Sequence, residues 1–103
     1  MAMHLGADQA AAISEFCTRH RVQELALFGS AIRDDFTPAS DVDLLIDFAP
    51  GEAPSLFGFV DMRDELSAMF GGRQVDLVMK GGLSNYLADR ILSERVVLYE
   101  RRP

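Results

Sequence analysis

Hydrophobic and polar residues alternate along this chain with two periods, and each change of period marks the boundary of a predicted element. The first stretch repeats apolar residues every three or four positions, which predicts a helix capped by Asp8 and running to about His20. Because the single cysteine falls on this apolar stripe, Cys17 is predicted to be a core residue rather than a nucleophile. The inward positions of the helix are Ala10, Ile13, Phe16 and Cys17.

Four stretches are rich in the residues that strands favour: 22–28, 41–48, 74–80 and 95–100. In the second of them the period is two, so its side chains divide between the two faces of a sheet. Val42, Leu44, Ile46 and Phe48 fall on one face. Asp41, Asp43 and Asp47 fall on the other face, together with Leu45.

Shorter and longer helical patterns separate these strands. Residues 30–35 could form one or two helical turns before Pro38 ends them. Ser55 and Ser84 are the expected caps of two helices, the first ending near Phe70 before two glycines and the second near Glu94. The inward positions of the first are Leu56, Phe59, Val60, Leu66 and Phe70, whereas Phe57 falls off this stripe and could face a partner.

Strands that alternate with helices indicate an α/β fold with a small mixed or parallel sheet flanked by helices. The chain has 103 residues, so residues 1–103 are predicted to form a single domain with one modest core.

The composition excludes several classes of protein. The net charge of −6 disfavours a role in non-specific nucleic-acid binding, because an acidic surface repels phosphate backbones. One cysteine leaves no internal disulfide and too little sulfur for a cysteine-based zinc site. The N-terminal residues do not resemble a signal peptide, and no apolar run is long enough to span a membrane. A cytoplasmic protein is therefore predicted.

The aspartates at the start of the second strand are the first candidate site. Asp41 and Asp43 point to the same face and lie only about 7 Å apart along the strand. Two carboxylates held so close repel each other unless a cation lies between them. Mg²⁺ prefers such oxygen ligands and is often held by one or two carboxylates together with substrate phosphates.

A second candidate feature stands upstream, where the first strand gives way to the short helical turn. Gly29 lets the backbone approach a ligand, and Ser30 with the start of the turn offers hydrogen-bond donors to a phosphate. Asp76, in the third strand, supplies another carboxylate. If these strands are neighbours, Asp76 could complete a metal site or accept a proton from an attacking hydroxyl.

Together these residues resemble a known signature. Gly29-Ser30, ten residues and then Asp41-Val42-Asp43 is similar to the motif of the nucleotidyltransferase superfamily that includes DNA polymerase beta, and the short chain resembles its minimal nucleotidyltransferase branch. Arg33, Pro38 and Ser40 also fall where members of that branch often carry Arg, Pro and Ser or Thr. Asp34 departs from the pattern, because a glycine is common at that position.

The resemblance implies a polymerase beta-like fold and a role for each matching residue. Gly29 and Ser30 would hold the β- and γ-phosphates of ATP, and Arg33 could add a positive contact to the phosphate tail. Asp41 and Asp43 would bind two Mg²⁺ ions. Asp76 would ligate one of these ions and act as the base on the acceptor hydroxyl.

The resemblance also implies an acceptor and a partner. Minimal members typically transfer AMP from ATP to a tyrosine of a HEPN-domain RNase toxin and so act as its antitoxin. A catalytically weak binding module that neutralises such a partner by contact is the alternative, and Asp34 beside the phosphate turn favours it. Transfer to a small molecule such as an aminoglycoside is a third possibility, which usually needs an extra substrate domain.

Overall fold

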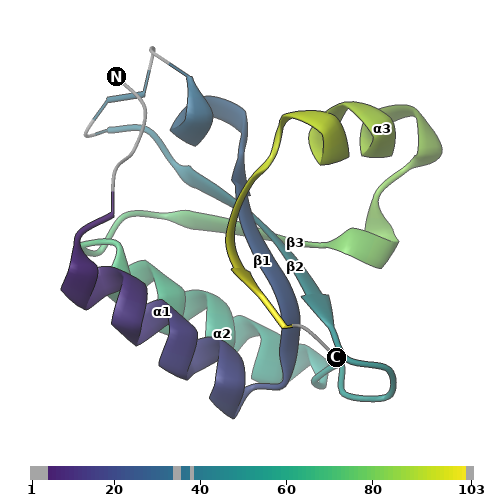
Figure 1. The fold of residues 1–103 in the computed structure, drawn as a ribbon, viewed down its shortest axis with the longest axis horizontal. Helices are drawn as coiled ribbons and strands as arrows, with labels where there is room; N and C mark the ends of the chain where they lie inside the picture. The colour runs from purple at the N-terminus through teal and green to yellow at the C-terminus, as the bar shows by residue number, and fades with distance from the viewer. Residues whose placement is uncertain (1–4, 34–35, 38, 102–103) are drawn as a thin grey trace.

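Figure 1 shows the computed structural model, which describes residues 5–33, 36–37 and 39–101. Every helix and strand predicted from the sequence is present within this range. In chain order the elements are α1 (Ala7–Arg19), β1 (Val22–Phe28), the 3-10 helix η1 (Gly29–Ile32), β2 (Val42–Phe48), α2 (Leu56–Met69), β3 (Val75–Met79), the 3-10 helix η2 (Lys80–Gly82), α3 (Asn85–Glu94) and β4 (Val96–Glu100). The helical turns expected at 30–35 are thus η1, while Asp34 and Pro38 lie outside the described residues.

The four strands form one sheet in the order β3-β2-β1-β4. β2 and β3 run parallel, and β1 is antiparallel to both β2 and β4. The prediction of an α/β fold with a small mixed sheet is therefore confirmed. In Figure 1, α1 and α2 lie side by side against one face of the sheet, and α3 stands on the opposite side.

The core fills the space between the sheet and the helices α1 and α2. The alternation predicted for β2 is confirmed, because Val42, Leu44, Ile46 and Phe48 all belong to this core. Cys17 is fully buried beside them, and burial raises the pKa of its thiol to about 12. Such a thiol stays protonated at neutral pH and packs as an apolar group, as the sequence predicts.

Two predictions about α1 are wrong. Its N-cap residue is Gly6, and no side chain caps it; Asp8 instead lies in the first turn, where its charge favours the positive end of the helix. Ala10 is exposed, because the face of the first turn toward α2 carries Gln9, whose amide donates to the backbone oxygen of Met69.

The inward face of α2 also differs from the prediction. Leu56 is 75% exposed, whereas Met62 is buried. Met62, Leu66 and the C-cap residue Phe70 are buried and follow one another at intervals of four residues. Four residues before Met62 this row reaches Gly58, so Leu56 does not belong to it. Phe57 is 83% exposed, which confirms that it lies off the inward stripe.

The helix boundaries follow the predicted signals closely. The hydroxyls of Ser55 and Ser84 accept hydrogen bonds from Gly58 and Leu87, so both serines cap their helices. α2 ends before Gly71-Gly72, and both glycines have a positive φ that other residues adopt with strain. None of the helices in the described part of the chain combines the length and the apolar character needed to cross a membrane.

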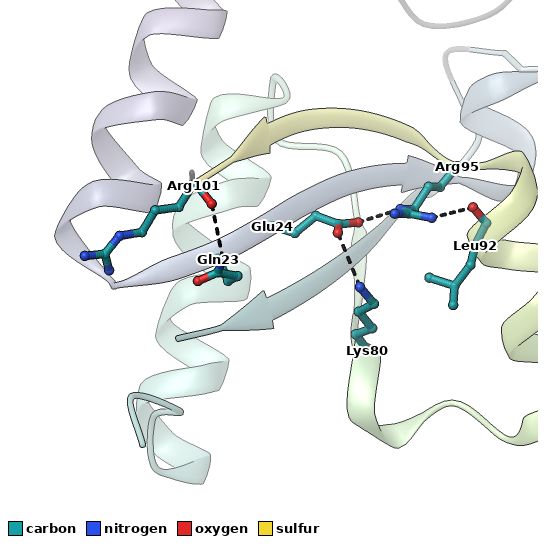
Figure 2. A network of polar contacts seen from close by, with 6 residues as sticks. All are labelled: Gln23, Glu24, Lys80, Leu92, Arg95 and Arg101. Atoms are coloured by element: carbon teal, nitrogen blue, oxygen red, sulfur yellow. Dashed lines mark hydrogen bonds and ion pairs between the residues drawn. The ribbon is translucent and has the colours of Figure 1, made fainter. Parts of the chain in front are cut away.

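A buried acid on the other face of the sheet was not predicted. Glu24 of β1 is only 5% exposed and accepts hydrogen bonds from Arg95 at 2.5 Å and from Lys80 at 3.4 Å (Figure 2). Arg95 also donates to the backbone oxygen of Leu92, near the end of α3. Since Lys80 precedes α3 and Arg95 follows it, Glu24 ties both ends of the α3 segment to the middle of the sheet.

Candidate active site

The sheet register brings two of the predicted aspartates together. Asp43 of β2 is paired with Asp76 of the neighbouring parallel strand β3 and, on its other side, with Phe28 at the end of β1. Asp43 alternates along β2 with the core residues Val42 and Leu44, so its side chain leaves the sheet on the face opposite α1 and α2. Asp76 lies on the same face, directly beside it.

The electrostatics of this pair are unfavourable to two negative charges. The pKa of Asp43 is raised above its usual value, first by burial and then by the charge of Asp76 and a side-chain hydrogen bond with it. The charge of Asp41 adds to this rise in pKa, and the nearby guanidinium of Arg33 opposes it. An extra positive charge at this point would therefore relieve repulsion that the protein leaves partly uncompensated.

Asp41 occupies a different position from the other two. It precedes β2, is exposed, and its backbone oxygen accepts a hydrogen bond from the hydroxyl of Ser30 at 3.5 Å. Within the described part of the chain, no three His, Cys, Asp or Glu side chains are grouped closely enough to hold a metal ion by themselves. The structure thus pairs Asp43 with Asp76 and leaves Asp41 at the rim, and a metal here would need further oxygen ligands from a substrate.

The turn between β1 and β2 lies directly against this pair. Gly29 has φ +65°, and a Cβ atom built on it would stand 2.2 Å from an oxygen of Asp43. Only glycine therefore leaves room for the carboxylate, in addition to tolerating the left-handed backbone. Arg33 closes the turn, since its backbone N–H donates to the oxygen of Ser30 at 3.0 Å.

An open cleft of about 750 Å³ leads to the two carboxylates. It passes around the edge strand β3, so that residues from both faces of this strand line it, and helix α2 forms its other side. The residues that line it include Asp43 and Asp76 together with Arg63, Asp64 and Ser67 of α2. No sequence motif marks these α2 residues. Arg63, Asp64 and Ser67 lie on one face of the helix because Ser67 follows the other two by four and three positions. This helix directly precedes β3, the strand that carries Asp76.

Comparisons with known proteins show which sequences and folds this chain is similar to. A family model described as a nucleotidyltransferase domain matches residues 11–98. A protein of Thermococcus cleftensis named protein adenylyltransferase MntA is 43% identical over 82 residues, which are 80% of this chain and 80% of that protein.

Two solved structures are similar in fold. One belongs to a toxin–antitoxin complex with AMP-PNP; it has a TM-score of 0.72 at 18% identity and covers 90% of this chain and 74% of its own. The other belongs to a complex of a tri-AMPylated Shewanella oneidensis HEPN toxin with an MNT antitoxin; its TM-score is 0.64 at 17% identity, over 90% of this chain and 71% of that one. At these identities the likeness shows a shared fold.

Proposed function

The chain belongs to the nucleotidyltransferase domain family, and we propose that it transfers AMP from ATP to a hydroxyl group of a partner protein. The observation that carries the proposal is the pairing of Asp43 with Asp76 directly beside the Gly29-Ser30 turn. A phosphate-binding turn next to two carboxylates is the arrangement that phosphoryl and nucleotidyl transfer requires.

Each residue of the site has its own role in the proposed reaction. The backbone at Gly29 and the hydroxyl of Ser30 hold the β- and γ-phosphates, and Arg33 contributes positive charge to that end. The acceptor oxygen attacks the α-phosphorus in line with the departing oxygen, the bond to the β-phosphate oxygen breaks, and pyrophosphate leaves. Asp76 accepts the proton of the acceptor hydroxyl. The exposed position of Asp76 in the cleft allows an acceptor side chain to approach it.

The donor set also fits the cation that the family implies. Asp43 and Asp76 offer hard oxygen ligands, Asp41 lies at the rim, and the triphosphate would supply the oxygens that the protein lacks. Mg²⁺ ions bound here, two in the full arrangement, would neutralise charge on the α-phosphate and on the departing pyrophosphate. The raised pKa of Asp43 is consistent with a carboxylate that is incomplete without such a counter-charge.

For the acceptor we propose a tyrosine of a HEPN-domain RNase toxin, which the chain would silence as an antitoxin. Two likenesses support this choice: the Thermococcus relative is named a protein adenylyltransferase, and one structural neighbour comes from a complex of an AMPylated HEPN toxin with an MNT antitoxin. The net charge of −6 agrees with a protein acceptor rather than a nucleic acid.

The test is the mass of the partner protein. The HEPN-domain protein proposed as partner is incubated with this chain, ATP and Mg²⁺. Intact-protein mass spectrometry should show the addition of AMP, peptide mapping should place it on a tyrosine, and the RNase activity should be lost. Silencing with no change in mass would contradict the enzyme and favour a binding module that acts by contact.

Binding of ATP should require a divalent cation. Without it, Asp43 and Asp76 repel the triphosphate, so we expect the affinity for a non-hydrolysable ATP analogue to fall by at least tenfold, about 1.4 kcal/mol, when EDTA replaces Mg²⁺. Titration calorimetry in the two buffers measures this. Equal affinity in excess EDTA would show that the carboxylates do not act through a metal.

Replacing Gly29 by alanine should impair the protein more than its backbone strain explains. A left-handed alanine costs about 1–2 kcal/mol in unfolding free energy, and at Gly29 the new Cβ also displaces the Asp43 carboxylate. Gly71→Ala is the matched control, because Gly71 has φ +73° and a Cβ added there would meet no atom within 4 Å. Denaturant unfolding should show a larger loss for Gly29→Ala, and only that variant should lose transfer activity. Equal losses for the two variants would show that the close approach to Asp43 has no role.

A further inference from the structure

Helix α3 is attached to the protein at its ends and hardly packed along its length. None of its residues is buried. The ion pairs of Glu24 with Lys80 and Arg95 hold the two ends of the segment, as Figure 2 shows, while the body of the helix stands away from the sheet in Figure 1. α3 is therefore held through its ends, and its side chains stay at least partly accessible.

A hollow of about 200 Å³ lies between α3 and the phosphate turn. One wall is formed by Phe28, Gly29 and Arg33, which precede, form and close that turn. The opposite wall is the inner face of α3, which presents Leu87, Arg90, Ile91 and Glu94. Two guanidinium groups from different parts of the chain, Arg33 and Arg90, therefore line one hollow beside the glycine of the turn.

We propose that Arg90 is a second cationic ligand of the donor's triphosphate, presented from α3 opposite the Gly29-Ser30 turn. This inference rests on the proposed function, because it takes the turn to hold the β- and γ-phosphates. Arg90 would contact those terminal phosphates and not the α-phosphate, since it lines the hollow at Gly29 and not the cleft that contains Asp43 and Asp76.

The charges around the turn favour a second guanidinium at the terminal phosphates, in addition to the Mg²⁺ ions proposed at the α-phosphate and the departing pyrophosphate. The donor carries its largest negative charge at the terminal phosphates, and Asp41, Asp43 and Asp76 add three carboxylates nearby. Arg33 is the cation that acts on Asp43 across the turn. A guanidinium on the far wall can bind two phosphate oxygens at once, which gives both charge compensation and orientation.

The ion pair of Arg90 with Glu94 leaves the guanidinium able to bind a phosphate instead. Its Nε lies 3.5 Å from Glu94, one turn further along α3, and the side chains are 67% and 46% exposed. An exposed pair of this kind contributes little to stability, so the guanidinium can exchange a carboxylate for a phosphate at small cost. Glu94 is thus a weak partner that a phosphate of the donor can replace.

The experiment compares ATP with AMP. With Mg²⁺ present, titration calorimetry of Arg90→Ala should show about tenfold weaker binding of a non-hydrolysable ATP analogue, while binding of AMP, which lacks the β- and γ-phosphates, stays unchanged. Arg90→Lys should recover part of the loss because it keeps the charge. Arg19→Ala is the matched control: Arg19 is also a helix arginine paired with a glutamate, but on α1, across the sheet.

Each result has a definite meaning. Failure of the wild-type protein to bind ATP with Mg²⁺ would refute the proposed function itself. Normal ATP binding by Arg90→Ala would refute only the role of Arg90, and so would an equal loss for ATP and AMP, which would place Arg90 at the nucleoside. A loss of partner modification with unchanged ATP affinity would assign Arg90 to the partner interface and likewise overturn the inference.

Discussion

Asp43→Asn should abolish nucleotidyl transfer while the protein stays folded. Asparagine keeps the size of the side chain and its hydrogen-bonding capacity, but it removes a charge at the centre of the site, between Asp76 on one strand and Gly29 on the turn. The lost metal contact is expected to lower the rate by at least the factor of about 10²–10⁴ that loss of a general base typically causes. Asp76→Asn, which removes the proposed base, should fall in the same range.

Asp47→Asn is the matched control for these variants. Asp47 lies on the same strand and the same face as Asp43, two positions beyond Leu45, and it is paired with Glu24, away from the Gly29-Ser30 turn. Its substitution removes the same charge from the protein but should leave transfer near the wild-type rate. The measurement is partner mass and partner RNase activity after incubation with each variant, ATP and Mg²⁺. If Asp43→Asn still silences the partner without a mass change, the chain acts as a binding module.

Asp43→Asn should make the metal-free protein more stable than the wild type at neutral pH. Because the pKa of Asp43 is raised in the folded state, the folded protein binds this proton more tightly than the unfolded chain does. The contribution of Asp43 to stability is therefore full below the unfolded pKa and is lost as the pH rises through the folded pKa. The stability difference between Asp43→Asn and the wild type should grow across that window, which denaturant unfolding at several pH values measures.

Local signals predicted most of this fold. The two-residue alternation in β2 identified the core face correctly because the strand has α1 and α2 on one side, while Asp43 and Asp47 lie on the other. Serine caps and the Gly71-Gly72 pair located the ends of the later helices because these groups satisfy the free backbone atoms of a helix terminus. The errors at Asp8, Ala10 and Leu56 arose in first turns, where periodicity does not show which side meets a neighbouring element.

The site was predictable to the extent that its residues belong to strands. Asp43 and Asp76 could be expected to meet because a parallel pairing of two adjacent strands places them in register. The contact between Gly29 and the Asp43 carboxylate depends on the backbone path of the turn, which no spacing in the sequence reveals. Arg90 belongs to a helix with no motif, and only the position of α3 places it across a hollow from Gly29.

Glu24 shows the limit of sequence analysis most clearly, and its substitution should have the largest effect on stability. Its partners Lys80 and Arg95 lie 56 and 71 residues away in the chain, so an acidic residue within β1 has no visible reason in the sequence. Glu24→Gln would leave the two cations half-buried without a counter-charge. Breaking a buried ion pair from one side costs about 3–5 kcal/mol, and we expect about 3 because Lys80 remains partly in water.

Glu65→Gln provides the control for this last prediction. Glu65 also bridges two basic side chains, Arg19 and His20 at the end of α1, but a third of its side chain is exposed. An exposed bridge contributes about 1 kcal/mol or less, so the two glutamine variants should differ by about 2 kcal/mol in denaturant unfolding. Since Glu24 holds both ends of α3, its variant should also bind the ATP analogue more weakly, in the same direction as Arg90→Ala, whereas Glu65→Gln should not. Equal stability of the two variants would show that the Glu24 network does not fix the ends of α3 to the sheet.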